Sequence, residues 1–311
     1  MSRDSASATS APLLLLVDGT GVAYRAFFAV KHLSAPDGHP TNCLFGFVRL
    51  LDHLAKALHP DRMVVAFDGG SPASRLEKCP AYKAQRPHMP DDLRCQFPLL
   101  DDFLDAAGIP RCLIPHQEAD DVLATLATDA AAHDWTVRIA TSDKDLMQLV
   151  TPAIHLVSPS KDLAVLDPAA VQAKTGVAPS QIVEWLALIG DVADNIPGVP
   201  GIGPVTASRL LADHGTLEAV YAALPTLTPP GLRAKLVDAR ERTDINLALM
   251  TLDRHVPGVP AAATLPPPVP PSEDALVAFY RRHNLNSFVS ERLFLSPPPP
   301  APPAPTQLSL F

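Results

Sequence analysis

Long apolar runs are missing from this sequence. No stretch approaches the roughly 20 consecutive apolar residues that a membrane-spanning helix needs. The N-terminus is rich in serine and alanine, and it lacks the basic segment and apolar core of a secretory signal. We therefore expect a disordered lead at residues 1–11, a cytoplasmic protein and no membrane contact.

Cysteine is also scarce. The four cysteines show neither the CxxC spacing of a zinc site nor the dense pattern of a disulfide framework. Reduced thiols are expected at Cys43, Cys79, Cys95 and Cys112.

Basic residues are outnumbered, because 25 Lys and Arg face 33 Asp and Glu, which gives a formal net charge of −8. Taken alone, this balance argues against nucleic acid as a partner, since neutralising phosphates usually requires a basic surface. The objection weakens if the carboxylates are concentrated at a metal site.

Proline, in contrast, is abundant. The 35 prolines gather at residues 225–230, 266–271 and 297–305, which is typical of linkers. The 311 residues, 47% of them hydrophobic, suffice for one large domain or two modest ones.

Three short apolar runs, at residues 13–17, 63–67 and 136–140, have the length of buried strands, and each leads into an aspartate. Helical patterns at residues 43–58 and 119–132 alternate with them. This order predicts an α/β fold with a mostly parallel central sheet. Because ligands bind beyond the carboxyl ends of such strands, the aspartates should meet at one edge.

Carboxylates recur at the predicted strand ends and helix starts. The 3.6-residue period places Glu118 and Asp121 on one face of a helix N-terminus, with Asp120 beside them. For any single pair, a first-turn helix charge or a solvated turn is the better interpretation. Five segments that converge on one edge favour a metal cluster, and all-oxygen ligands favour magnesium or manganese. The nine candidate metal ligands are Asp18, Asp68, Glu118, Asp120, Asp121, Asp143, Asp145, Asp191 and Asp194.

A glycine-rich hairpin at residues 200–204 joins two predicted helices, and a further helical pattern covers residues 273–294. Together with the acidic segments, these form an ordered series that resembles the motifs of the polymerase I 5′-nuclease and flap endonuclease family over residues 12–295. The motifs are Val17-Asp18-Gly19, Phe67-Asp68, Tyr82-Lys83-Ala84-Gln85-Arg86-Pro87, Glu118-Ala119-Asp120-Asp121-Val122, Ser142-Asp143-Lys144-Asp145-Leu146 and residues 190–203.

The resemblance implies a PIN-like, resolvase-like α/β nuclease domain at residues 12–170, with a helical arch at about 72–100. An all-helical DNA-binding domain with a helix-hairpin-helix, the 5′-3′ exonuclease C-terminal subdomain, would follow at 171–295. A proline-rich linker at 296–306 and a short tail at 307–311 would end the chain. Since no polymerase or proofreading domain follows, we expect a stand-alone form.

The family also implies two metal clusters that hold magnesium, for which manganese can substitute. By position, Asp18, Asp68, Glu118 and Asp120 fall on the first, and Asp121, Asp143, Asp145, Asp191 and Asp194 fall on or between the two. Every acidic position of the family pattern is filled, which favours an active enzyme in which Asp120 is catalytic.

Four of the cations in the segment that matches the arch are candidate DNA contacts. Lys83 and Arg86, three residues apart, would share a helix face and match the family's catalytic cations on the scissile phosphate, although an ordinary surface helix is the alternative. Arg75 and Lys78 are expected to contact DNA. Arg25 matches a phosphate contact, whereas the neighbouring Tyr24 is equally compatible with the core.

The resemblance assigns Gly198, Gly201 and Gly203 to the hairpin that contacts the DNA backbone, where free carbonyls can hold potassium. The family usually has lysine at the places of Pro200 and Val205. The departure implies that the hairpin binds duplex DNA more weakly, or more through its own main-chain groups.

The chain ends on a short apolar string after its last proline cluster. A solvated tail has no folding reason to finish on Leu-Ser-Leu-Phe, and the string resembles the peptide that binds the bacterial sliding clamp, with chance as the alternative. The candidate clamp-binding residues are Gln307, Leu308, Leu310 and Phe311.

The predicted function is a structure-specific 5′-3′ exonuclease and 5′-flap endonuclease, acting on flaps, nicks and ends in Okazaki fragment processing and DNA repair. Two alternatives stay open. One is a clamp-tethered junction binder without turnover, which the intact carboxylates oppose. The other is a metal-dependent ribonuclease of the same α/β class, which the hairpin and arch oppose. RNA primers and DNA flaps are not separated as substrates. We expect a monomer associated with the nucleoid.

Overall fold

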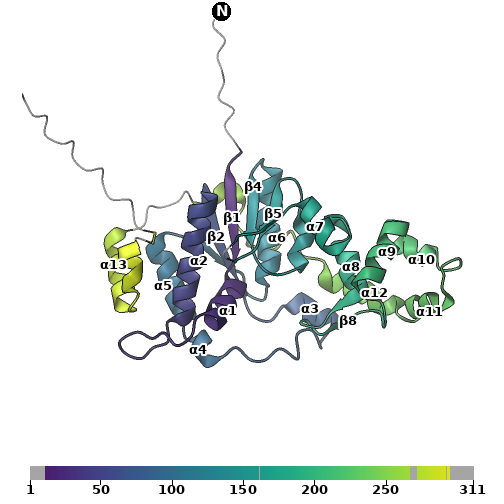
Figure 1. Ribbon diagram of the computed structural model, residues 1–311, viewed down its shortest axis with the longest axis horizontal. Helices are drawn as coiled ribbons and strands as arrows, with labels where there is room; N and C mark the ends of the chain where they lie inside the picture. Colours follow the sequence, from purple (N-terminus) through teal and green to yellow (C-terminus); the bar gives the residue numbers. More distant parts are fainter. Residues whose placement is uncertain (1–10, 161, 267–271, 292, 295–311) are drawn as a thin grey trace, which may run out of the picture.

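The computed structural model describes residues 11–160, 162–266, 272–291 and 293–294. An α/β unit and a helical unit lie side by side along the long axis of the molecule (Figure 1). The predicted linker and tail, and residues 1–10 of the predicted lead, lie outside the described residues. Within the described ranges, no helix combines the length and the apolar character needed to cross a membrane.

A six-stranded sheet forms the centre of the α/β unit, in the order β3-β2-β1-β4-β5-β6. The first five strands pair in parallel, and β6 pairs antiparallel to β5 at one edge. The predicted mostly parallel sheet is therefore confirmed. The strands are β1 (Leu13–Asp18), β2 (Arg62–Phe67), β3 (Arg111–Leu113), β4 (Thr136–Ala140), β5 (Ile154–Val157) and β6 (Val165–Leu166).

The central strand β1 supplies both hydrophobic cores. Leu14 and Leu16 point into the core on one face of the sheet, while Leu15 and Val17 point into the core on the other. All four side chains are completely buried, as the alternating geometry of a strand covered on both faces requires. The run of apolar residues in the sequence follows from this double burial.

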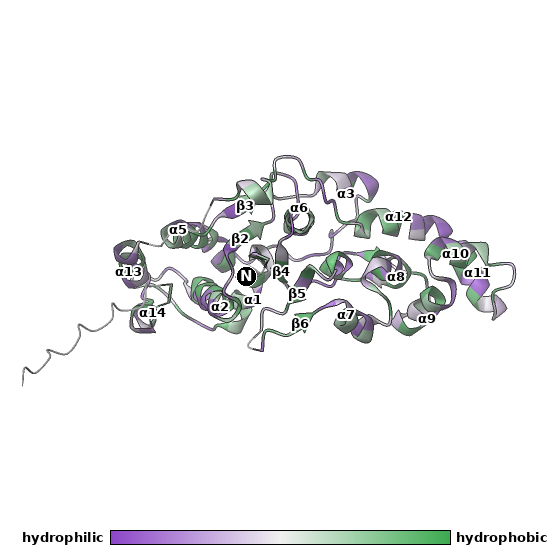
Figure 2. Ribbon diagram, turned by 90° about the horizontal axis from the view of Figure 1, so that it is seen from above, coloured by the Kyte–Doolittle hydropathy of each residue, from purple (hydrophilic) through white to green (hydrophobic). Residues whose placement is uncertain are grey.

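Helices cover both faces of the sheet. Figure 2 shows α6 on one side and α1 with α2 on the other. The helical patterns predicted at residues 43–58 and 119–132 correspond to α2 and α6. The helices of this part are α1 (Gly19–Ala29), α2 (Asn42–Leu58), α3 (Ala73–Lys78), α4 (Asp91–Arg94), α5 (Phe97–Ala107), α6 (Ala119–Ala132) and the 3-10 helix η1 (Asp145–Leu149).

The predicted arch is not a continuous helix. Between α3 and α4 the chain runs through turns and extended backbone beneath the sheet (Figure 1). Lys83 lies in a turn with a left-handed backbone (φ 56°), so it does not share a helix face with Arg86. The expected helical spacing of these two cations is wrong, although the turn still places them close together, since the N–H of Arg86 donates to the carbonyl of Lys83 at 3.0 Å.

The helical unit follows β6 and contacts the α/β unit through hydrogen bonds. The N–H of Lys83 donates to the carbonyl of Asp194 at 2.9 Å, and the Gln148 amide donates to the carbonyl of Met250 at 2.9 Å. Its elements are α7 (Pro168–Thr175), η2 (Pro179–Gln181), α8 (Ile182–Ile189), β7 (Gly190–Asp191), β8 (Ile196–Pro197), α9 (Pro204–His214), α10 (Leu217–Ala222), α11 (Pro230–Asp238), α12 (Arg240–Met250) and η3 (Ala262–Thr264).

After the helical unit the chain returns to the α/β unit. Helices α13 (Glu273–Arg282) and α14 (Asn286–Glu291) lie beside α5 and α2, at the end of the molecule opposite α10 (Figure 1). The Phe288 ring stacks on Phe45 with 4.8 Å between centroids. The predicted DNA-binding domain at 171–295 therefore ends before α13, because the last two helices bury their apolar faces in the core of the α/β unit.

Candidate active site at the carboxyl edge of the sheet

Two of the predicted aspartates end neighbouring parallel strands, and backbone donors hold both. Asp18 ends β1 and caps α1, because its Oδ1 accepts from the N–H of Gly21 at 2.8 Å. Its Oδ2 accepts from the Thr141 hydroxyl at 3.1 Å. Asp68 follows β2, and its Oδ1 accepts from the N–H of Ala119 at 2.8 Å, at the start of α6. The carboxylates are thus positioned before any ligand arrives.

Two more aspartates join this edge. Asp143 follows β4, and its Oδ1 accepts from the N–H of Asp145 at 2.8 Å. Asp120 lies in the first turn of α6. A cavity of about 650 Å³ collects these carboxylates beside two cations of the arch segment. Its charged lining residues are Asp18, Asp68, Asp120, Asp143, Lys83 and Arg86.

A second acidic group lies where the two units meet. Asp145, Asp191 and Asp194, all buried, each offer a carboxylate oxygen within 4.8 Å of the others. Asp145 Oδ1 has no hydrogen-bond partner in the described part of the chain. A buried oxygen without a partner, beside two further carboxylates, fits a divalent cation with oxygen ligands.

The electrostatics of both groups fit the same ligand. Burial, with the charges of Asp143, Asp191 and Asp194, raises the pKa of Asp145 to about 8. Burial, with the nearby Asp68 and Asp143, raises the pKa of Asp18 to about 6. A bound cation would relieve this repulsion and let the carboxylates ionise at neutral pH.

Without divalent cations, the free energy of unfolding should therefore fall as the pH rises. The folded chain retains protons on Asp18 and Asp145 that the unfolded chain has lost. The contribution of these two groups to the free energy of unfolding is therefore complete below the unfolded pKa of about 4. It is lost as the pH passes the folded pKa values of about 6 and about 8. Melting temperatures measured in EDTA between about pH 4 and about pH 8.5 test this slope.

Asp145→Asn is the matched variant for this experiment. It should flatten the slope in EDTA, because it removes the group with the pKa of about 8. Magnesium should raise the melting temperature of the native chain most at the alkaline end. Identical slopes for the native chain and the variant would contradict the assignment.

Lys83, Arg86 and Tyr82 surround the carboxylates from the arch segment. Lys83 Nζ forms an ion pair with Glu118 and lies 3.6 Å from Asp194 Oδ2. Arg86 pairs with Asp194, and the Tyr82 hydroxyl donates to Asp194 Oδ2 at 3.0 Å. Burial of four-fifths of the Lys83 side chain opposes its charge, but the carboxylates of Glu118 and Asp194 outweigh this effect and raise the pKa of Lys83. It therefore stays protonated.

Arg75 and Asp121 do not occupy the positions predicted for them. The Arg75 side chain is buried, and it donates to both Glu118 Oε2, at 2.6 Å, and Asp121 Oδ1, at 2.9 Å. Asp121 Oδ1 also accepts from the N–H of Asp253 at 2.9 Å, and Arg75 Nε donates to the carbonyl of Leu249 at 3.0 Å. This network does not support Arg75 as a DNA contact or Asp121 as a metal ligand. It joins α3, α6 and α12.

Arg75→Met should lower the free energy of unfolding by about 3–5 kcal/mol, because it leaves the buried Asp121 carboxylate without its counter-ion and leaves Glu118 with Lys83 alone. Urea unfolding at neutral pH measures the change. Lys78→Met is the control, since Lys78 is exposed on the same helix and should change stability by less than about 0.5 kcal/mol. Equal effects of the two substitutions would show that the network contributes little.

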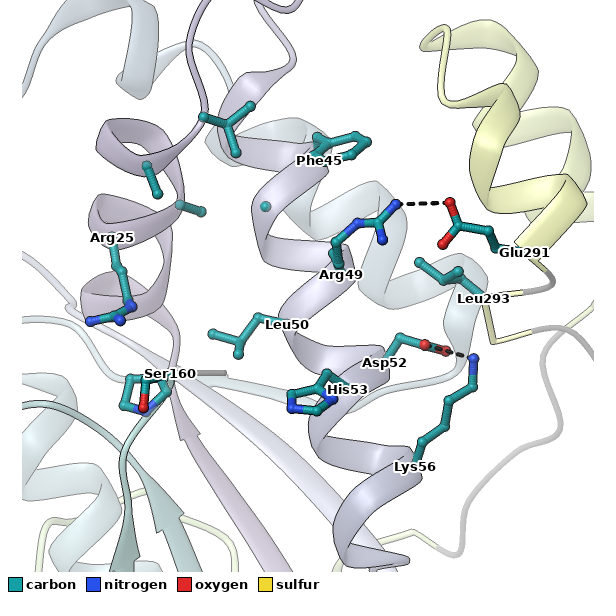
Figure 3. Close-up of a pocket in the computed structure, with 15 residues that line it drawn as sticks. Arg25, Phe45, Arg49, Leu50, Asp52, His53, Lys56, Ser160, Glu291 and Leu293 are labelled. Carbon is teal, nitrogen blue, oxygen red and sulfur yellow. Dashed lines mark hydrogen bonds and ion pairs between the residues drawn. The ribbon is translucent and has the colours of Figure 1, made fainter. Parts of the chain in front are cut away.

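Arg25 lines a second hollow of the surface. Its side chain projects from α1 into a groove of about 570 Å³ that α2 borders on the other side (Figure 3). The α2 cations in the groove already have acidic partners, Arg49 with Glu291 at 2.9 Å and Lys56 with Asp52 at 2.7 Å. Among the described residues no carboxylate forms an ion pair with Arg25, although its charge helps to lower the pKa of Asp162. The phosphate contact predicted for Arg25 stays a prediction.

Three site residues were not predicted as such. Lys144 Nζ lies 3.3 Å from Asp191 Oδ2, and Thr141 and Tyr82 donate to the carboxylates described above. All three lie within or next to predicted motifs, which is the signal that could have found them. Tyr24, left open between core and site, is half-buried and lines the cavity of Asp120.

The glycine-rich hairpin is a tight turn between β8 and α9. A Cβ on Gly198 would collide with the backbone of Ile189, and Gly201 has a left-handed backbone (φ 76°). Gly203, in contrast, faces open space in the described structure. The first two glycines are therefore required by the backbone itself, and contact of all three with DNA remains a prediction.

The fold and the site together define a class of protein. The mostly parallel sheet carries a carboxylate-lined cavity at its carboxyl edge, with cations beside it and a helical unit that contains a tight hairpin. These features are those of an α/β protein that cleaves phosphodiester bonds. Comparison with known families agrees. Residues 13–176 match the N-terminal resolvase-like domain of 5′-3′ exonucleases, and residues 177–267 match their C-terminal SAM fold. The chain belongs to the 5′-3′ exonuclease family.

Relatives and solved structures support this membership. The chain is 42% identical to the 5′-3′ exonuclease of Aquifex aeolicus over 205 residues, which cover 66% of this chain and 71% of that protein. It is 40% identical to DNA polymerase I of Pseudomonas aeruginosa over 287 residues, 90% of this chain and 31% of the relative. The chain thus spans about a third of the length of the polymerase relatives it matches.

Among solved structures, T5 5′-exonuclease with bound divalent zinc ions has a TM-score of 0.66 at 25% identity, over 86% of this chain and 96% of that one. The catalytic core of Rad2 in complex with a DNA substrate has a TM-score of 0.61 at 19% identity, over 88% of each chain. The second likeness concerns the fold alone.

Proposed function

We propose that the chain is a structure-specific 5′-3′ exonuclease and 5′-flap endonuclease that hydrolyses DNA phosphodiester bonds with divalent cations. The observation that carries this proposal is the cavity that Asp18, Asp68, Asp120 and Asp143 share with Lys83 and Arg86. Primer and flap removal in Okazaki fragment processing, and DNA repair, are the roles that such an activity would serve.

The carboxylates on the cavity would hold one magnesium ion, and Asp145, Asp191 and Asp194 would hold another, with manganese as a substitute. When bound, the ions supply an activated water and neutralise charge on the phosphate. Asp120 is the carboxylate we assign to catalysis, because burial and the charges of Asp143 and Asp18 raise its pKa well above its ordinary value. Metal binding there would release a proton to solvent.

Lys83 and Arg86 would bind the scissile phosphate from the arch segment. In the structure both cations contact carboxylates, Lys83 with Glu118 and Arg86 with Asp194. A phosphate that enters the cavity would exchange these partners for its own oxygens. In a site from which water is excluded, each such contact can lower the barrier by about 3 kcal/mol.

Duplex DNA would bind at the hairpin, with the phosphate backbone close to Gly198, Gly201 and Gly203. Among the described residues no hydrogen-bond donor contacts the carbonyls of Pro200 or Gly201, and these oxygens are the ones that could hold potassium. Arg25 and Lys78 would add contacts to the phosphate backbone.

Residues 307–311 lie outside the described residues. We propose that Gln307, Leu308, Leu310 and Phe311 bind the bacterial sliding clamp, because this apolar string directly follows a proline cluster. Removal of these five residues should abolish binding of the chain to purified clamp without changing cleavage of short DNA.

The proposed activity is tested with a 5′-labelled double-flap DNA in magnesium and in EDTA. Release of a flap-length product that needs magnesium would support the nuclease. Binding of the junction with no product under either condition would instead favour the clamp-tethered junction binder. Cleavage of RNA alone would favour a ribonuclease, and an RNA-primed flap beside a DNA flap compares the two substrates.

A further inference from the structure

The hairpin has no basic side chain of its own. Residues 198–205 contain only glycine, proline, valine and isoleucine. The valine at the start of α9, Val205, is 85% exposed, so an apolar side chain occupies a prominent place beside the turn. Because affinity for duplex DNA comes mainly from cations near phosphates, charge must come from elsewhere.

Two cations from other helices converge on the turn. The ammonium of Lys235, on α11, lies directly over Gly201, where a Cβ would collide with it. Arg242, on α12, donates from Nη1 to the carbonyl of Gly198 at 3.4 Å. Both side chains are exposed, so each can reach a phosphate while it stays beside the backbone of the hairpin.

The other two basic residues of these helices are directed away from the turn. Arg233 donates to the carbonyl of Pro225 at 3.2 Å. Arg240 pairs with Asp244 at 3.2 Å and lies over the Tyr221 ring at 4.2 Å. Of the four basic residues on α11 and α12, only Lys235 and Arg242 therefore gather at the hairpin.

A buried amide fixes α12 against this turn. Asn246, one helical turn after Arg242, donates to the carbonyls of Ala187 at 3.0 Å and Pro197 at 2.9 Å. Asn246 is 2% exposed, so these bonds are shielded from water. The helix that carries Arg242 is thus attached to both α8 and β8, and the Arg242 side chain starts from a preset position.

We propose that Lys235 and Arg242 form the phosphate-binding site of the hairpin and supply the charge that the turn lacks. The ligand is a phosphate of the duplex strand that lies against the turn. This inference rests on the proposed function, because it assumes that the hairpin binds duplex DNA. The two side chains hold the DNA and take no part in the bond-breaking step.

The test is fluorescence anisotropy of a labelled nicked duplex with the full chain, in calcium to prevent cleavage. Lys235→Ala and Arg242→Ala should each weaken binding about five- to tenfold. Each should also reduce the slope of log affinity against log salt by about 1, because one phosphate contact is lost. Lys235→Arg and Arg242→Lys should restore most of the affinity, since they keep the charge.

Arg233→Ala is the matched control, because it removes a cation from the same helix as Lys235 without changing the hairpin. It should leave both affinity and salt slope unchanged. If Lys235→Ala and Arg242→Ala bind the duplex as tightly as Arg233→Ala, the inference is wrong, and backbone groups of the hairpin bind the DNA instead. If the native chain itself binds no duplex, the proposed function fails first, and the two failures are thereby distinguished.

Discussion

Asp120→Asn should reduce the single-turnover rate of flap cleavage by about 10³-fold or more while the chain stays folded. The substitution keeps the shape of the side chain but removes one negative charge and weakens a candidate metal ligand. Asp120 lies near Asp143, Asp18 and Asp68, which favour its neutral form, so the neutral amide should add no repulsion to this group. The variant should therefore melt at the same temperature as the native chain in EDTA, or higher.

Rapid-quench measurements at saturating enzyme give the rate, and Asp134→Asn, in the turn before β4, is the matched control. A variant that cuts at the native rate would remove Asp120 from catalysis. A variant that loses both cleavage and its melting transition would report unfolding, and Asp68→Asn would then replace it, because Asp68 is more exposed.

Lys83→Ala should lower the same rate by about 10²- to 10³-fold, with a much smaller effect on DNA binding. The ammonium is held beside Glu118 and Asp194, and its charge would act on the phosphate during cleavage, where a positioned donor contributes most. Arg94→Ala, in the same segment but exposed, should change the rate less than about threefold.

A parallel loss of affinity and rate in Lys83→Ala would mean that the lysine only binds DNA. Arg86→Ala should show the smaller of the two effects, because the Arg86 side chain is about half exposed and its charge is screened by water.

The sheet and its acidic edge could be predicted because strong local signals coincide. The strands β1, β2 and β4 are short apolar runs, and each leads into an aspartate. Their apolar composition, their length and the polar residues that follow them all indicate buried strands. The strands β3, β5 and β6 were missed, since three residues such as Arg111–Leu113, with two exposed side chains, carry no such pattern.

The partners of individual side chains could not be predicted. A buried arginine and an exposed one look the same in sequence, so the pairing of Arg75 with Asp121 across 46 residues gave no signal. Likewise, the amphipathic pattern of α13 showed that one face is buried but not which core receives it. The approach of Lys235 to Gly201 depends on how α11 packs, which no local pattern encodes.

The return of α13 and α14 to the α/β unit has a mechanical consequence. The helical unit is a loop of chain whose two ends are both anchored to the sheet domain, and the hydrogen bonds of Lys83 and Gln148 close the gap between them. A part tethered at both ends swings less than one on a single linker. The distance between the hairpin and the carboxylates should thus be nearly constant. If the hairpin binds duplex DNA as proposed, this distance would determine how far from the bound duplex the phosphodiester bond is hydrolysed.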